Sequence, residues 1–329
     1  MGDRATLLAA KLRGLVRDRI GPAIAADFPG GAALVEGASG WVLIDGPPLA
    51  ALGPALVWAD RRGLTDFGLV VEVDADIVAR RAELCTDPPA VWLVEGTSLT
   101  RAAAAPVEPA ALPVAAPDLA ELLIDADVEV VVEHGIVRGE VLGLEVARIV
   151  HGTTTAGMPI DAPVLEVGVG HADRELTSML HGNLPPADQL ARVVEIVRGQ
   201  RRAGAERHPL NQLAPERWLR ALLIAEPARL GLTSLRAAPP ALPRPNLRDP
   251  SVAIAVGTDA TGDDVVVACS VGIHLDLVPA AADARAALAP AARLLLVVPE
   301  RDAHPVTRAL ADRLRAPAEL VALPGDWRS

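Results

Sequence analysis

The first hundred residues alternate between hydrophobic and polar positions in a way that predicts helices and strands in turn. Apolar residues recur at helical spacing across residues 3–26, and Pro29-Gly30-Gly31 ends that segment. Two short apolar runs, Ala32–Gly37 and Trp41–Asp45, flank a glycine-rich turn and predict a β-hairpin. The pattern continues with a predicted helix at Pro47–Arg62, a strand at Phe67–Val73, a helix at Asp74–Leu84 and a strand at Ala90–Glu95.

The same order of predicted elements returns near the carboxyl end of the chain. A hairpin is predicted there, followed by alternating helices and strands, at Ser251–Val256, Asp264–Cys269, Val278–Leu288, Arg293–Val298, His304–Leu314 and Glu319–Leu323. The lengths between elements agree in the two copies, whereas the residues do not. We therefore expect an α/β fold with two similar ββαβαβ units, at residues 1–101 and 251–329. Strands that alternate with helices favour largely parallel sheets.

The part of the chain between these two units has a different pattern. Two stretches rich in alanine and proline, residues 102–117 and 237–250, predict linkers on either side of it. Residues 118–236 then predict a middle α+β segment. Its expected elements are a helix at Leu119–Ile124, strands at Val128–Glu133, Ile136–Val150 (bent at Gly143) and Val164–Gly168, and helices at Ala172–Leu180, Ala187–Arg202 and Ala214–Ala225.

Composition narrows the class of protein. Hydrophobic residues make up 51% of the chain and charged residues 22%, as in globular proteins. The apolar runs are too short, or too often broken by proline and charge, to span a membrane, and the first residues lack the apolar core of a signal peptide. The two cysteines, Cys85 and Cys269, lie far apart in the sequence, which fits a reducing compartment. We therefore expect a cytoplasmic protein that does not enter the membrane.

The charge balance bears on nucleic-acid binding. The chain has 42 acidic and 31 basic residues, a net charge of −11, whereas proteins that hold duplex DNA usually present a basic face. Lys11 is the only lysine, and the excess of arginine indicates a GC-rich coding bias rather than phosphate recognition. A basic groove built by arginines of the middle segment would reverse this expectation; the candidates are Arg138, Arg148, Arg174, Arg198, Arg201 and Arg202.

Reactive side chains gather in the middle segment. The run Leu165–Glu175 predicts a strand that carries Glu166, a glycine-rich turn and a polar helix start with His171 and Arg174. If two strands pair as a hairpin through residues 151–163, Glu166 lies opposite Arg148 or Glu145.

A metal site is one interpretation of this arrangement. Carboxylate oxygens suit Mg²⁺ or Mn²⁺, so Glu145, Glu166 and His171 form a candidate metal site. Strand alternation places Glu140 and Glu145 on opposite faces, unless a bend at Gly143 changes this. The alternative is that the acids simply lie on the solvated face of a half-exposed hairpin.

Two stretches of this segment resemble a known nuclease core. The order of a helix, two strands that each carry an acid and a second helix is similar to the core of the PD-(D/E)xK restriction-endonuclease-like superfamily, and the matching stretches are Arg138–Glu145 and Val164–Gly168. The resemblance implies that Glu140 or Glu145 takes the first acidic metal-binding place and Glu166 the second, with Mg²⁺ or Mn²⁺ as the cofactor.

The resemblance covers residues 118–185 and departs from the family at one important position. Gly168 stands where the family carries its catalytic lysine, and the chain has no lysine other than Lys11. Arg174 or His171 would have to supply the missing positive charge. The resemblance therefore implies either an altered site or a relative that has lost its activity.

Cys269–Gly272 is a further candidate, because it ends an apolar strand ahead of a helix, where nucleophiles are known to lie. Cysteine is also among the residues most often simply buried.

Three functions are open at this point. The absence of a complete catalytic set favours a non-catalytic scaffold or interaction protein without a cofactor, whose partner is another protein or a second copy in a homodimer. The first alternative is a metal-dependent (Mg²⁺ or Mn²⁺) nuclease-like phosphodiesterase or a degenerate relative. The second is a small-molecule-binding α/β protein, with its ligand at the carboxyl ends of parallel strands near Asp45-Gly46 and Cys269–Gly272.

Overall fold

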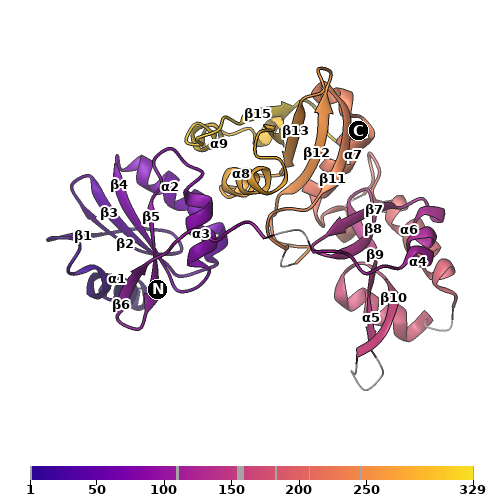
Figure 1. The fold of residues 1–329 in the computed structure, drawn as a ribbon, viewed down its shortest axis with the longest axis horizontal. Helices are drawn as coiled ribbons and strands as arrows, with labels where there is room; N and C mark the ends of the chain where they lie inside the picture. Colours follow the sequence, from indigo (N-terminus) through magenta and orange to yellow (C-terminus); the bar gives the residue numbers. More distant parts are fainter. Residues whose placement is uncertain are drawn as a thin grey trace. The chain divides into compact units, whose positions relative to one another are not determined.

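The chain forms a mixed α/β structure with three open sheets (Figure 1). The computed structural model describes residues 2–108, 111–153, 159–181, 184–206, 208–244 and 246–328. None of the helices in these ranges is both long enough and apolar enough to cross a membrane. The chain divides into two compact units: unit 1 comprises residues 1–107, 273–287 and 304–320, and unit 2 comprises the remainder.

The sheet of unit 1 has six strands in the order β1-β2-β3-β4-β5-β6. They are β1 (Ile24–Ala26), β2 (Gly31–Glu36), β3 (Ser39–Ile44), β4 (Asp66–Val71), β5 (Ala90–Glu95) and β6 (Ser98–Arg101). The predicted hairpin and the two strands that follow it are confirmed as β2 to β5. Only the pairs β3–β4 and β4–β5 are parallel, so the sheet is mixed rather than largely parallel. The sequence pattern did not indicate the two edge strands β1 and β6.

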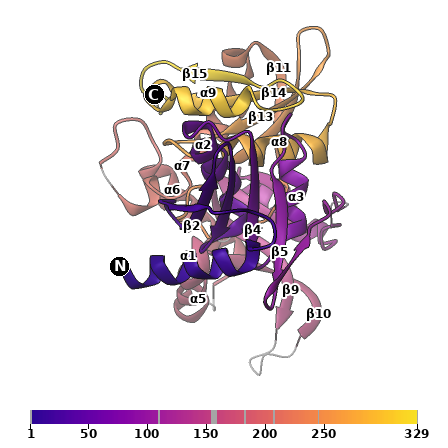
Figure 2. The same cartoon turned by 90° about the vertical axis from the view of Figure 1, so that its left-hand side faces the viewer.

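Helix α1 (Gly2–Val16) crosses the strands of this sheet and buries Leu12 against them (Figure 2). The helix predicted over residues 3–26 is too long. The helix ends at Val16, and residues 24–26 pair with β2 as the edge strand β1. Gly21-Pro22 prevents the helix from continuing to residue 26, because proline has no N–H to donate and disfavours helical geometry in the residue before it.

Unit 1 also contains four helices from distant parts of the chain. They are α2 (Leu52–Arg61), preceded by the 3₁₀ helix η1 (Pro48–Ala50), α3 (Ala75–Ala82), α8 (Leu277–Leu288) and α9 (Pro305–Ala311). The segments that follow α3 and α9 meet in a short antiparallel bridge. The Thr86 N–H donates to the Arg313 carbonyl at 2.8 Å, and the Arg315 N–H donates to the Leu84 carbonyl at 2.9 Å. Backbone pairing thus joins segments more than 200 residues apart.

A buried cluster of charges also joins α3 to α8. Arg80 Nε lies 2.9 Å from Asp283 Oδ1, and Arg81 Nε lies 3.1 Å from Asp283 Oδ2. Arg81 Nη1 also reaches Asp276 Oδ2 at 3.2 Å. Burial raises the pKa of Asp276 to about 7, because the loss of hydration outweighs the attraction of Arg81.

Asp276 should make the stability of the protein depend on pH. Its pKa in the folded state lies above the ordinary value of 3.8, so the folded state binds more protons than the unfolded state between these values. Its contribution to stability is therefore complete below about pH 4 and is lost as the pH rises through about 7. We expect Tm to fall across this range by calorimetry, and Asp276→Asn to reduce the fall. The exposed control Asp87→Asn should keep the wild-type slope; an equal slope in Asp276→Asn would contradict the assignment.

The other two sheets belong to unit 2, apart from Glu319 and Leu320 at the start of β15. The middle sheet is antiparallel throughout, in the order β10-β9-β8-β7. The C-terminal sheet is mixed, in the order β11-β12-β13-β14-β15. Their strands are β7 (Glu129–Glu133), β8 (Ile136–Val141), β9 (Leu144–Thr153), β10 (Pro159–Val167), β11 (Leu232–Ala238), β12 (Ala253–Asp259), β13 (Asp264–Cys269), β14 (Arg293–Pro299) and β15 (Glu319–Leu323).

The bent strand predicted at Ile136–Val150 is in fact a hairpin. Strands β8 and β9 are joined by Leu142 and Gly143, whose φ angles are 48° and 75°. Positive φ at both central residues is typical of a type I′ turn, which usually carries asparagine, aspartate or glycine. Leucine rarely adopts a positive φ, so the residue type concealed the turn.

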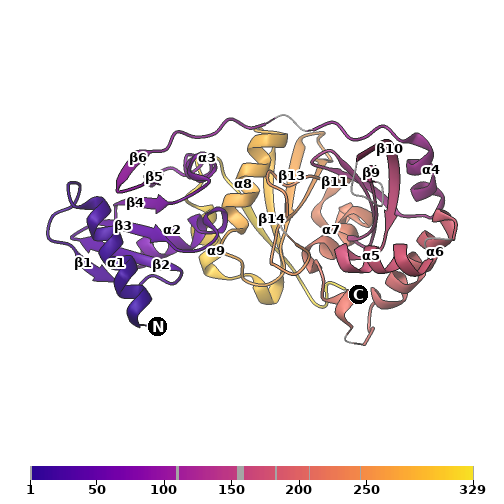
Figure 3. The same ribbon diagram turned by 90° about the horizontal axis from the view of Figure 1, so that it is seen from below.

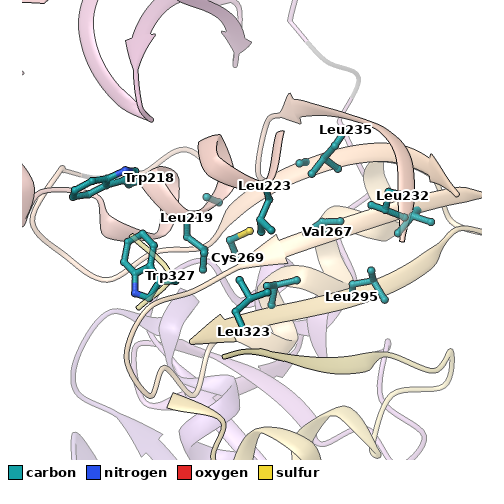
Figure 4. Packing of buried hydrophobic residues seen from close by; sticks show 14 residues of the cluster. Trp218, Leu219, Leu223, Leu232, Leu235, Val267, Cys269, Leu295, Leu323 and Trp327 are labelled. Carbon is teal, nitrogen blue, oxygen red and sulfur yellow. The ribbon is translucent and has the colours of Figure 1, made fainter. Parts of the chain in front are cut away.

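Each sheet of unit 2 is covered by helices. Helices α4 (Pro117–Asp125) and α6 (Pro186–Gln200) share one core with the middle sheet, in which Leu123 and Leu190 are fully buried (Figure 3). Helix α7 (Pro215–Ala225) packs Leu219 and Leu223 against Val267 of the C-terminal sheet (Figure 4). The remaining helical elements are α5 (Gly170–His181), η2 (Pro209–Asn211), η3 (Pro227–Leu230) and η4 (Glu300–Asp302).

Candidate functional site

Glutamate and arginine side chains alternate in a continuous series of contacts through the middle sheet. We name this series the acid–arginine chain. It includes Glu140, Glu145 and Glu166, the three acids that the sequence nominated. In order of contact its members are Arg148, Glu166, Arg174, Glu145, Arg138, Glu133, Arg217, Glu140 and Arg220.

The first members of the chain lie near the surface. Glu166 on β10 is paired with Arg148 on β9, as the predicted hairpin required, and Arg148 Nη2 lies 2.8 Å from Glu166 Oε2. Arg174 of α5 reaches both predicted metal-binding acids: its Nη1 lies 2.9 Å from Glu145 Oε1 and its Nε lies 3.6 Å from Glu166 Oε2. Arg138 donates to the other oxygen of Glu145. The carboxylates of Glu145 and Glu166 therefore both contact one guanidinium, that of Arg174.

A β-bulge explains why Glu145 lies on the same face of the sheet as Arg138 and Arg148. The register shifts between the pairs Gly139–Ala147 and Glu140–Glu145, which leaves Val146 as an extra residue on β9. An extra residue reverses the alternation of side chains along a strand. Glu145 is the cross-strand partner of Glu140 and shares a face with it, so the change of direction at Gly143 is the exception that the expectation of opposite faces allowed for.

The last members of the chain are buried. Arg217 Nη2 lies 2.6 Å from Glu133 Oε2, Arg220 Nη2 lies 2.6 Å from Glu140 Oε2, and Arg217 also donates to Glu140. Burial alone would raise the pKa of Glu140, but the two guanidiniums together outweigh it and lower that pKa below its usual value. Neither Arg217 nor Arg220 was predicted from the sequence as part of the site. Their spacing of three residues in a largely apolar helix was the available signal, since such residues share a helix face.

The surface end of the acid–arginine chain opens into a pocket of about 750 Å³. We name it the β10–α5 pocket, because strand β10 and helix α5 supply most of its walls. Its lining residues are Arg148, Gly152, Val164, Leu165, Glu166, Val167, His171, Arg174, Glu175, Met179 and Gln189. Three of the five residues nominated as catalytic candidates, Glu166, His171 and Arg174, thus line one pocket.

His171 lies apart from the two converging acids. Its side chain is 77% exposed, and its Nδ1 lies 3.5 Å from Glu175 Oε2. Among the described residues, no group of three or more histidine, cysteine, aspartate or glutamate side chains is arranged to hold a metal ion. The metal site at Glu145, Glu166 and His171 stays a prediction.

The arginines proposed for a basic groove are mostly engaged elsewhere. Arg198 pairs with Asp127 at 2.8 Å, and Arg202 donates to the carbonyl of Gly199. Arg201 is buried and donates to the carbonyls of Leu142, Leu210 and Leu213. Of the six candidates, Arg148 and Arg174 line the β10–α5 pocket.

Cys269 lies deep in the core of the C-terminal sheet, beside Leu219 and Leu223 (Figure 4). Burial raises the pKa of its thiol to about 12, so the thiol stays protonated near neutral pH. A thiol in this state is a poor nucleophile, which favours the structural interpretation of Cys269.

Comparison with known proteins adds no further guide to the site. No family model, curated protein or solved structure matches the chain. The resemblance to the PD-(D/E)xK superfamily stays a hypothesis that depends on the short stretches around Glu140, Glu145 and Glu166.

The buried and exposed ends of the acid–arginine chain should differ sharply in their effect on stability. Glu140→Gln leaves Glu133 as the one carboxylate of the acid–arginine chain that faces the buried guanidiniums of Arg217 and Arg220, and should lower the free energy of unfolding by about 3–5 kcal/mol. Glu166→Gln is the matched control, because Glu166 is 39% exposed, and it should cost about 0–1 kcal/mol. Urea denaturation measures both. Equal losses in the two variants would contradict a buried network that holds α7 to the middle sheet.

Proposed function

We propose that this chain is a non-catalytic interaction protein that binds another polypeptide, or a second copy of itself, through unit 2. One observation carries the proposal: each nominated acid is held by two arginines. Glu140 contacts Arg217 and Arg220, Glu145 contacts Arg138 and Arg174, and Glu166 contacts Arg148 and Arg174.

Such pairing does not suit proton transfer or metal binding. A general base needs a lone pair that is free to accept a proton, and a metal ligand needs a carboxylate oxygen free for the cation. Guanidiniums stay protonated at physiological pH and cannot take over the role of a base. The chemistry of the cluster therefore supports structure and recognition rather than catalysis.

Exposed apolar side chains beside the pocket support an interaction surface. Leu176 and Met179 on α5 are 53% and 84% exposed, and Val164 on β10 is 36% exposed. Single exposed apolar residues are common, but a group of them next to an edge strand is typical of docking surfaces. The surface would accept a partner protein or, by the usual twofold symmetry of homodimers, a second copy.

A metal-dependent nuclease-like phosphodiesterase, or a degenerate relative of one, is the second candidate. The observation that favours it is the position of Arg174, which lines the pocket and whose guanidinium contacts both Glu166 in the pocket and the buried Glu145. On this proposal Arg174 supplies the positive charge of the missing lysine, and Mg²⁺ or Mn²⁺ would bind once the guanidinium moves aside.

A small-molecule-binding function is the third candidate. A separate pocket of about 330 Å³ is lined by residues that follow β14 and β15, among them Glu300, Arg301 and Arg328. Ligands of open α/β sheets bind outside the carboxyl ends of the strands.

We also propose that the two α/β segments are copies of one ββαβαβ unit. The pairings β2–β3 and β12–β13 are antiparallel, whereas β3–β4 and β13–β14 are parallel. The same order of pairings in both segments supports a common unit.

Thermal unfolding with and without Mn²⁺ or Mg²⁺ distinguishes the first two candidates. A cation that binds only the folded state raises Tm, so an interaction protein whose acids are occupied by arginine should show no metal-dependent change. Glu166→Gln should behave in the same way. If Mn²⁺ raised the Tm of the wild type and Glu166→Gln removed that rise, the metal-dependent candidate would replace the interaction function.

A further inference from the structure

We propose that the β10–α5 pocket binds an extended peptide segment with an acidic side chain, which adds a strand to the free edge of β10. This inference rests on the proposed interaction function and names the site and the chemistry of the partner. It follows from three features of the pocket: the backbone of β10, the shape of the lining and the balance of charge.

Strand β10 has backbone groups available for pairing, because it is the outermost strand of the middle sheet. In an antiparallel ladder, every second residue of an edge strand directs its N–H and C=O away from its neighbour. The Gly168 N–H donates to the Val146 carbonyl at 2.8 Å, which fixes the alternation. The backbone N–H and C=O groups of Val164 and Glu166 therefore bond to β9, whereas the backbone groups of Leu165 and Val167 point away from β9. Pro163 falls on the outward set, where the missing N–H of proline does no harm.

The shape of the pocket fits a strand laid along this edge. Four consecutive residues of β10, Val164–Val167, line it. Consecutive side chains of a strand point to opposite faces, so a pocket that all four reach runs along the edge and not over one face. Residues of α5, including Arg174 and Met179, form the opposite wall. A strand and a helix that flank a groove are the setting in which peptides bind by β-strand addition.

The balance of charge selects an acidic peptide. The acid–arginine chain has five arginines and four glutamates, so an arginine stands at each of its two ends. Arg148 lies at the pocket end of the chain, and its Nε and Nη2 both contact the same oxygen, Glu166 Oε2. Burial lowers the pKa of Arg174; Glu145 and Glu166 oppose this change, whereas the charges of Arg148 and Arg138 add to it. A carboxylate from a ligand would relieve this crowding of positive charge.

The remaining lining residues favour a peptide over a nucleic acid. The lining has two arginines and two glutamates, a balance that suits a single carboxylate beside Arg148 better than a chain of phosphates, and it contains no aromatic side chain on which bases stack. Val164 and Met179 instead offer apolar contacts beside Arg148. One carboxylate flanked by apolar side chains is the complementary ligand.

A phage-displayed library of random peptides, panned on the full-length chain, tests this proposal. The enriched peptides should carry an aspartate or glutamate between apolar, β-branched residues. Fluorescence anisotropy of the synthetic peptides should give at least about tenfold weaker binding to Arg148→Gln, the loss of one charged hydrogen-bonded contact. The matched control Arg229→Gln, an exposed arginine of unit 2, should bind like the wild type. Hydrogen exchange should slow at the amides of Leu165 and Val167.

Other outcomes overturn the proposal and keep it distinct from the interaction function. Peptides that bind Arg148→Gln as tightly as the wild type would remove this pocket as the site, while their binding would leave the interaction function standing. A library that yields no binder, or a single-stranded oligonucleotide that binds through Arg148 in place of peptides, would reject the acidic-peptide partner. If Arg148→Gln fails to fold, Arg148→Lys keeps the positive charge but lacks the planar guanidinium that can donate two parallel hydrogen bonds, and it should still weaken binding.

Discussion

The carboxylate of Glu140 lies fully buried between the guanidiniums of Arg217 and Arg220, and the architecture of unit 2 depends on this contact. A buried charge without a partner costs several kcal/mol, so the three groups stay together or the region loses its structure. Glu140 belongs to β8 of the middle sheet, and the arginines belong to α7, which packs on the C-terminal sheet. Arg220 also donates to the carbonyl of Ile254. One charge pairing thus fixes a helix of one sheet against a strand of another.

The same alternation of charges continues from this buried contact to the surface. Each arginine after Arg217 shares its donors between two carboxylates, until Arg148 ends the series at the β10–α5 pocket. Arginine has two consequences in such a series. It holds the strands and helices together, and it occupies the oxygens that a cation or a proton would otherwise take. The acids that look like a nuclease site in the sequence are therefore part of a structural network, and the guanidinium of Arg148 at its pocket end is the group that we expect a partner to recognise.

The sequence predicted most strands and helices, because alternation and helical spacing report directly on which side of an element is buried. It also predicted that Glu166 lies opposite Arg148 or Glu145, and the structure pairs it with Arg148. The rest of the site depended on features that residue types do not reveal. The turn at Leu142-Gly143 places a leucine at positive φ, and the bulge at Val146 moves Glu145 to the other face. The contacts of α7 with Glu140 join residues about 80 positions apart, and no local pattern marks such a contact.

We expect arginine, and not a metal ion, to neutralise the converging acids Glu145 and Glu166. Crystals of the protein soaked in Mn²⁺ test it directly, since manganese scatters anomalously and its position can be mapped. We expect no anomalous peak between Glu145 and Glu166, and the guanidinium of Arg174 should remain in contact with both. A manganese peak bound by these two carboxylates, with Arg174 displaced, would show that a metal ion neutralises the acids and would favour metal-dependent chemistry at this site.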